Sequence, residues 1–294
     1  MESVRQALPI ICTLGEGCVW DAGTQSLYFV DIVNCMVYRW SRQDGSIRSR
    51  KMDGPVGCVV PSGNGRMVAA AAHSLWELDE SLTWDREIQT LSFPSWLRFN
   101  DGKCGPEGQL WVGTMAHDQG HLEAHKGGSL YCVDRTGVRA GYSGYTIPNG
   151  MAWSGDGSRF YHIDTETQCV DLYDVEGPYS ITGRRSVIRM GDGDGSPDGM
   201  TADRDGNLWV AMWGAGRVDC YDPHTGKLLR RIEVPAANVS CATFGDRDLK
   251  TLFITTAKDE DGQGGALYEV RLDVAGVLPF IYGEMTDTEE TDNG

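Results

Sequence analysis

Four oxygen-bearing side chains recur in one local context along the chain, and their types suggest chemistry. They are Glu16, Asn100, Asn149 and Asp198. Each stands directly before Gly or Asp-Gly, ten or eleven residues ahead of a short apolar run. Carboxylates gathered in one place repel one another unless a cation lies among them, and such hard oxygen donors suit Ca²⁺, Mg²⁺ or Mn²⁺. The alternative for any single one is a turn or strand cap, a common role of Asn and Asp.

The apolar runs that follow these residues belong to an internal repeat. Six such runs, at 27–30, 67–70, 110–113, 160–163, 208–211 and 252–255, begin 40, 43, 50, 48 and 44 residues apart. No window shows the sustained 3.6-residue period of a long amphipathic helix. A repeat of about 45 residues built on strand, turn and strand is typical of a β-propeller, whereas solenoid repeats are usually shorter. We therefore predict an all-β, six-bladed β-propeller with four antiparallel strands per blade, with seven blades as the main alternative.

This architecture would bring the four polar residues together. Equivalent positions of the innermost strands surround the central channel of a propeller, so side chains at one register converge on a small volume. The equivalent positions in the other two repeats fall near Gly57 and Cys241, which would leave one side of the ring open. The shared register in four repeats favours a cation site over four unrelated turn caps.

Composition limits the classes of function. The chain has 294 residues, 38 of them Gly, and a formal net charge of −16, which opposes binding to nucleic acid and to anionic membranes. It has neither an apolar stretch of the ~20 residues that a membrane helix needs nor the pattern of a signal peptide. Nine scattered cysteines without a C-x-x-C pair suit a reduced, cytoplasmic protein. We expect one domain over residues 1–285 and an acidic, disordered tail at 286–294.

Several segments resemble the family of gluconolactonase, senescence marker protein and luciferin-regenerating enzyme, which are six-bladed propellers. The matching segments are residues 14–20, 98–103, 113–115, 147–153, 196–200 and 208–211. The resemblance implies one divalent metal ion held by Glu16, Asn149 and Asp198. It also implies that Arg98 and Asn100 bind the substrate, with Asp101 close by. One departure is Cys18, which stands where many members have Pro and could loosen the turn that carries Glu16.

The resemblance implies an enzyme that hydrolyses sugar lactones to aldonic acids. Asp198 is our candidate for the general base that takes a proton from water, and the metal, whether Ca, Zn, Mn, Mg or Fe, would polarise the ester. Two alternatives remain: a hydrolase of other esters or phosphotriesters at the same metal site, and a non-enzymatic metal-binding propeller. We expect a monomer or a weak homo-oligomer that binds a small-molecule lactone.

Two further features of the sequence are left open. His117, His121 and His125 are spaced by four, but Gly120 interrupts the run, so we expect a rim loop rather than a second metal site. Trp213 follows one of the apolar runs and either packs in the core or faces the cleft.

Overall fold

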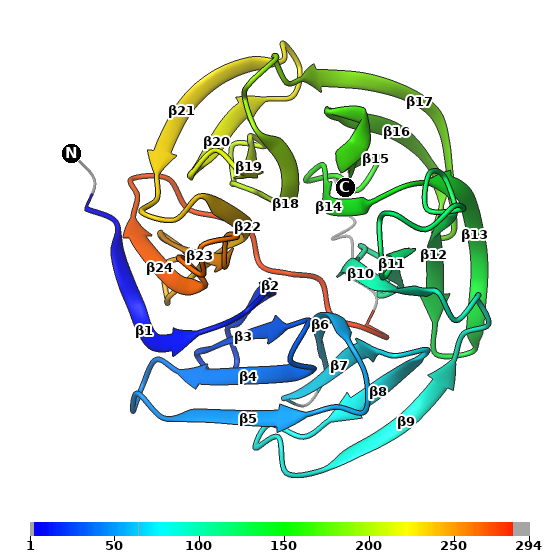
Figure 1. The fold of residues 1–294 in the computed structure, drawn as a ribbon, viewed down its shortest axis with the longest axis horizontal. Helices are drawn as coiled ribbons and strands as arrows, with labels where there is room; N and C mark the ends of the chain where they lie inside the picture. The colour runs from blue at the N-terminus through cyan, green and yellow to red at the C-terminus, as the bar shows by residue number, and fades with distance from the viewer. Residues whose placement is uncertain (1–2, 64, 285–294) are drawn as a thin grey trace, which may run out of the picture.

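Six antiparallel sheets of four strands surround a central axis in the computed structural model, which describes residues 3–63 and 65–284 (Figure 1). The predicted six-bladed propeller is confirmed. Each apolar run lies in the second strand of its blade, and one such strand, β3 (Ser26–Asp31), is buried along its whole length. Because neighbouring blades cover both faces of a middle strand, its sequence is continuously apolar rather than alternating.

The strands follow the chain from the axis outward in the first five blades. Blade 1 contains β2 (Gly15–Asp21), β3 (Ser26–Asp31), β4 (Met36–Ser41) and β5 (Ile47–Lys51); blade 2 contains β6 (Val56–Ser62), β7 (Arg66–Ala71), β8 (Ser74–Leu78) and β9 (Asp85–Thr90); blade 3 contains β10 (Leu97–Cys104), β11 (Leu110–Ala116), β12 (Gly128–Asp134) and β13 (Gly137–Tyr145). Blade 4 contains β14 (Pro148–Trp153), β15 (Arg159–Asp164), β16 (Cys169–Gly177) and β17 (Ser180–Arg189), with the short 3-10 helix η1 (Thr165–Thr167) after β15; blade 5 contains β18 (Ser196–Ala202), β19 (Leu208–Trp213), β20 (Arg217–Asp222) and β21 (Lys227–Glu233).

The sixth blade joins the two ends of the chain. It contains β22 (Asn238–Gly245), β23 (Thr251–Ala257), β24 (Ala266–Arg271) and, outermost, β1 (Arg5–Ile11). In β1, Arg5 stands opposite Glu269 of β24, and the Arg5 Nε atom donates to Glu269 Oε1 at 2.7 Å. Figure 1 shows the N-terminal strand, in blue, beside the orange strands of this blade. The ring is therefore closed by pairing between the first strand and the last repeat.

Large aromatic side chains fill the space between the blades. Trp20, Trp111 and Trp209, at most 1% exposed, are among the largest fully buried side chains. The Trp20 ring stacks on Phe253, with ring centroids 5.6 Å apart, which joins blade 1 to blade 6. Aromatic pairs of this kind add to the stabilisation from buried apolar area. The packing fixes how closely neighbouring innermost strands approach each other at the axis.

The segment after β24 crosses from blade 6 to blades 2 and 3 (Figure 1). The amide of Tyr282 donates to Pro61 O at 2.8 Å, and that of Gly283 donates to Gly108 O at 2.8 Å. The acidic tail expected at 286–294 lies outside the described residues, so that prediction is not examined by the structure. None of the described segments is a helix long and apolar enough to span a membrane.

Candidate functional site

A break in strand register occurs at the same level of every innermost strand. The register shifts lie between Glu16 and Val19, Val56 and Cys58, Phe99 and Gly102, Pro148 and Met151, Pro197 and Met200, and Val239 and Cys241. Such bulges re-aim side chains and increase the local twist of a strand. Five of the six residues selected from the sequence lie at these irregularities, and Arg98 lies just before the break in its strand. Because a bulge interrupts the regular alternation of side chains along a strand, it allows these residues to point toward the axis.

Glycines next to the bulged residues let adjacent blades approach closely. A Cβ atom on Gly150, directly after Asn149, would lie 2.6 Å from the carbonyl oxygen of Asp198. A Cβ atom on Gly199 would lie 2.7 Å from Ser240 O. Side chains cannot be added at such distances without moving the neighbouring backbone. Gly150 thus lets the strands that carry Asn149 and Asp198 approach closely, and Gly199 does the same for blades 5 and 6.

These side chains open into one pocket at the axis, which we call the axial pocket. Its volume is about 300 Å³, and it is lined by Leu14, Glu16, Ile32, Arg98, Asn100, Met115, Ile147, Asn149, Thr165, Ser196, Asp198 and Trp213. Five of the six predicted site residues are in this set. The structure therefore brings together residues from blades 1, 3, 4 and 5.

Asp101 is the exception among the predicted site residues. It is only 7% exposed, but it does not line the axial pocket, and its Oδ1 atom accepts from the amide of Gly102 at 2.7 Å. Burial raises the pKa of Asp101, although nearby Lys103 opposes this shift. The Lys103 side chain itself donates to Met200 O, across the channel in blade 5. The role of Asp101 in substrate binding therefore stays a prediction.

A chain of hydrogen bonds orients the two amide side chains of the pocket. Arg98 Nη1 donates to Asn100 Oδ1 at 2.8 Å, and Asn100 Nδ2 donates to Asn149 Oδ1 at 2.8 Å. Asn149 Nδ2 then donates to the hydroxyl of Thr165 at 2.8 Å. Since Asn100 Nδ2 also donates to Pro148 O, both of its hydrogens are used within the protein. Asn149 consequently presents its oxygen, rather than its nitrogen, beside the carboxylates.

Among the described residues, neither carboxyl group of the axial pocket forms an ion pair. Glu16 is 7% exposed and Asp198 is 5% exposed. Burial and the charge of Asp101 raise the pKa of Glu16 to about 8. Burial and the charge of Glu16 raise the pKa of Asp198 well above its ordinary value. The Oδ1 atom of Asp198 is buried and has no hydrogen-bond partner among the described residues. A buried acceptor left in this way needs a proton or a cation.

Arg98 supplies the positive charge at the edge of this pair without forming a salt bridge among the described residues. Burial lowers the pKa of Arg98 to about 10, while the charges of Glu16 and Asp198 oppose that shift. Its Nη1 atom is held by Phe99 O and Asn100 Oδ1. The remaining nitrogens of its guanidinium are left to meet a bound molecule, and such a planar fork suits oxygen acceptors.

Two aspartates that the sequence analysis missed hold the loops leading into the site. Asp31 accepts from the amides of Thr13 and Leu14 at 2.8 and 3.1 Å, just before Glu16. Asp164 accepts in the same way from the amides at 146 and 147, at 3.1 and 2.8 Å, just before Asn149. Both aspartates directly follow an apolar run, at the same position of repeats 1 and 4. The matching positions of these two aspartates in their repeats could have identified them from the sequence alone.

Five apolar residues also line the axial pocket, and the sequence analysis singled out none of them except Trp213, whose place it left open. The indole of Trp213 lines the pocket together with Leu14, Ile32, Met115 and Ile147. These residues come from four different blades or from the loops between them, so no local pattern marks them as a group. They give a bound molecule apolar surface within the same pocket as the charged groups.

The histidines of the loop at 117–125 have separate partners. The ring of His121 stacks on Trp96 at 4.5 Å between centroids, and His125 Nδ1 lies 2.9 Å from Glu166 Oε2. Across the residues that the structure describes, no three His, Cys, Asp or Glu side chains form a group that could hold a metal ion. The donor set of the axial pocket is different: two carboxylates and one amide oxygen. That set, with the unpartnered Asp198 Oδ1, fits a cation that prefers oxygen.

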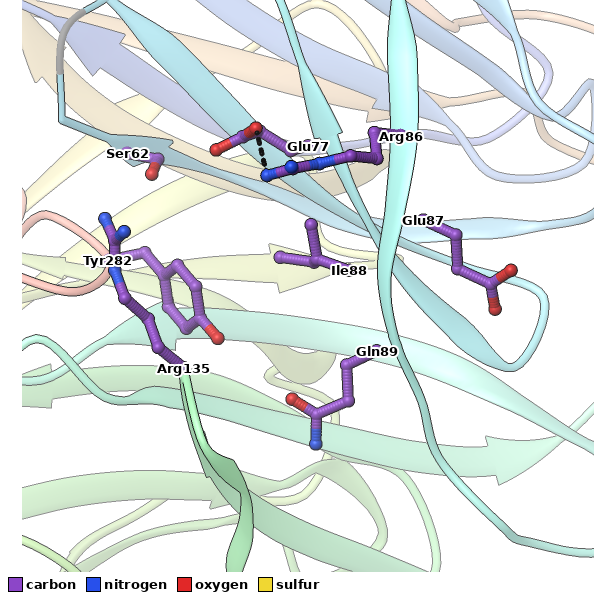
Figure 2. Close-up of a pocket in the computed structure, with 8 residues that line it drawn as sticks. All are labelled: Ser62, Glu77, Arg86, Glu87, Ile88, Gln89, Arg135 and Tyr282. Carbon is purple, nitrogen blue, oxygen red and sulfur yellow. Dashed lines mark hydrogen bonds and ion pairs between the residues drawn. The ribbon is translucent and has the colours of Figure 1, made fainter.

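A second hollow, which we call the outer groove, lies away from the axis beside blade 2. It has a volume of about 360 Å³ and is lined by Ser62, Glu77, Arg86, Glu87, Ile88, Gln89, Arg135 and Tyr282. Figure 2 shows Arg86 extended toward Glu77. Glu77 Oε2 accepts from Arg86 at 3.0 Å and from Arg66 at 2.9 Å. None of the residues predicted to do chemistry lines this groove.

Comparison with known proteins finds relatives that match nearly the whole chain. The "Putative sugar lactone lactonase YvrE" of Bacillus subtilis is 34% identical over 92% of this chain and 94% of its own. The solved luciferin-regenerating enzyme is 31% identical over 97% of this chain and all of its own, with a TM-score of 0.89. A calcium-binding protein, regucalcin, of Agrobacterium tumefaciens is 25% identical over 96% of this chain and 97% of its own, with a TM-score of 0.88.

The family model "SMP-30/Gluconolactonase/LRE-like region" matches residues 14–258. That range extends from the loop before the first innermost strand to the end of β23, and so includes every residue that the axial pocket draws from the innermost strands. The expected family resemblance is thereby confirmed. The chain belongs to the SMP-30/gluconolactonase/LRE-like family.

Proposed function

We propose that this protein is a metal-dependent hydrolase that opens sugar lactones to aldonic acids. The observation that carries the proposal is the axial pocket itself, in which two uncompensated carboxyl groups and an oriented amide oxygen meet beside an arginine. The family membership and the naming of a Bacillus subtilis relative as a sugar lactone lactonase support the same reaction. The naming of a solved relative as a calcium-binding protein supports the cation.

Glu16, Asn149 and Asp198 are the residues that would hold the ion. A divalent cation bound there would keep both carboxylates ionised and draw electrons from an ester carbonyl. The protein prepares this arrangement in two ways. The three residues stand at register breaks of neighbouring innermost strands and line one pocket, and the hydrogen bond from Asn149 to Thr165 fixes which end of the amide is free for an ion.

Asp198 is the residue that we assign as general base. Its Oδ1 atom is free of other hydrogen bonds, so once ionised it can take the proton of an attacking water. Arg98 would donate its remaining N–H groups to hydroxyl or carbonyl oxygens of the sugar and hold the ring in place. Asn100 would act through Arg98 and Asn149, because both of its own hydrogens are committed.

A titrimetric assay on a panel of aldonolactones, with and without a chelator, tests the proposal. Acid release that the chelator abolishes and added cation restores is the expected result. Release from simple esters or phosphotriesters alone would instead assign the pocket to a different hydrolase. Cation binding with no acid release from any of these substrates would identify a binding protein. The cytoplasmic location and the monomeric or weakly oligomeric state stay predictions.

A further inference from the structure

We propose that Thr165 is a positioning residue of the cation site, whose single hydroxyl sets the orientation of Asn149 and the position of Asp198 together. The inference rests on the proposed cation site. It concerns a residue that neither the spacing of the repeats nor the family resemblance singled out. Thr165 is the first residue of η1, directly after Asp164, and it lines the axial pocket.

The hydroxyl of Thr165 both donates and accepts a hydrogen bond. It donates its one hydrogen to Pro197 O at 2.8 Å, so a lone pair remains to accept from Asn149 Nδ2 at 2.8 Å. With its nitrogen held by Thr165, Asn149 must direct Oδ1 to the opposite side, where it accepts from Asn100. A second lone pair on Oδ1 is left for a cation. Reversal of the amide would place two N–H groups where the ion should bind.

The same hydroxyl also fixes the strand that carries the general base. Pro197, whose carbonyl it binds, directly precedes Asp198 in β18. A second bond from the same turn, Gln168 Nε2 to Ser196 Oγ at 3.1 Å, holds the adjacent residue of that strand. Thr165 therefore links one candidate ligand of blade 4 with one of blade 5 through a single oxygen atom. Groups that orient metal ligands in this way change metal affinity about 10–100-fold when they are removed.

The test measures cation affinity with Mn²⁺ and Ca²⁺ as probes, by calorimetric titration of chelator-treated protein. Thr165→Val keeps the shape of the side chain and removes the hydroxyl, and it should weaken binding by about 10–100-fold. Thr165→Ser restores the hydroxyl and should bind within about threefold of the unsubstituted protein. Thr167→Val is the matched control, because the hydroxyl of Thr167 in the same turn donates only to Asp164 O, away from the pocket.

The outcomes separate this inference from the proposed function. If Thr165→Val binds Mn²⁺ and Ca²⁺ as the unsubstituted protein does, or if Thr165→Ser is weakened equally, the positioning role is wrong while the cation site stands. If the unsubstituted protein binds neither ion, the proposed site itself is wrong. Circular dichroism melts show whether each variant is folded. Should Thr165→Val not fold, Thr165→Ala replaces it, and the role then requires weak binding by Ala beside strong binding by Ser.

Discussion

The axial pocket and the outer groove each contain a buried acidic side chain, and its charge is handled in opposite ways. In the outer groove, Glu77 is 8% exposed and forms an ion pair with Arg86 (Figure 2). It forms a second ion pair with Arg66. In the axial pocket, Asp198 is 5% exposed, has an unpartnered oxygen and stands beside a second carboxyl group. In the outer groove, two arginine side chains compensate the charge of the carboxylate. The axial pocket has Arg98 nearby but no ion pair to either carboxyl group among the described residues, and we propose that a bound cation supplies the missing compensation.

This difference shows why burial alone does not identify a site. A buried carboxylate that is paired with arginine is satisfied, so it gains nothing from a further cation. A buried carboxylate whose neighbours are acids and amide oxygens destabilises the ion-free protein, because its charge is neither solvated nor paired. A bound cation would remove that electrostatic cost. The arrangement of charges around an acidic group therefore distinguishes a functional position from a structural one.

Asp198→Asn should lower the rate of lactone hydrolysis by about 10²–10⁴-fold, the range expected when a general base is removed. Glu77→Gln is the matched substitution in the outer groove, and it should leave the rate unchanged because its charge serves only the two arginines. Initial rates on the best aldonolactone, with saturating cation, provide the measurement. A rate for Asp198→Asn within about tenfold of the unsubstituted protein would remove Asp198 from the role of base.

Removal of divalent cations should lower the thermal stability of the unsubstituted protein. Refilling the site to about 100 times its dissociation constant should add about 2.7 kcal/mol, because a ligand that binds only the folded chain stabilises it by mass action. The same addition should leave Asp198→Asn nearly unaffected, whereas Glu77→Gln should respond fully. Melting temperatures recorded at several cation concentrations test this. A flat response from the unsubstituted protein to every divalent ion would contradict the cation site.

The chelated protein should lose stability as the pH rises from about 4.5 to about 8. Glu16 ionises near 4.5 when it is exposed, but burial and Asp101 raise its pKa to about 8 in the folded chain. Between these values the folded chain holds more protons than the unfolded chain, so stability falls as pH increases. The raised pKa of Asp198 acts in the same direction.

Urea unfolding of chelated protein at several pH values measures this slope. Saturating cation should flatten it, because the ion keeps both carboxylates charged at every pH in the window. Glu16→Gln should reduce the slope without any ion present. A chelated protein whose stability increases with pH across the window would show that the two carboxyl groups do not control it.

Local sequence patterns were sufficient to predict the blades and the convergence of the polar side chains. The apolar runs mark the second strand of every blade, and counting back from them located Glu16 and Asn149 at one level of the ring. This worked because each blade is a local unit in which neighbouring strands pair through short turns. The closing strand β1 could not be found in the same way, since its partner β24 lies at the other end of the chain.

The parts that were missed depend on geometry between blades. Asn100 and Asp101 are adjacent within one register break of β10, yet only Asn100 lines the pocket, where its amide donates to Asn149 and Pro148 O of blade 4. The role of Thr165 depends on Pro197, which belongs to a different blade. Contacts of this kind are set by how the blades pack, and the order of residues along one strand contains no sign of them.

The smallest expected effect concerns the stability of the outer groove. Glu77→Gln should lower the free energy of unfolding by about 1 kcal/mol or less, because ion pairs with exposed partners contribute little. The side chains of Arg66 and Arg86 are 49% and 60% exposed, so water can solvate both after the charge of Glu77 is lost. Urea unfolding with cation present measures the difference. A loss of several kcal/mol would mean that the stability of the groove depends strongly on the charge of Glu77. The charge balance of the outer groove would then be no more robust than that of the axial pocket.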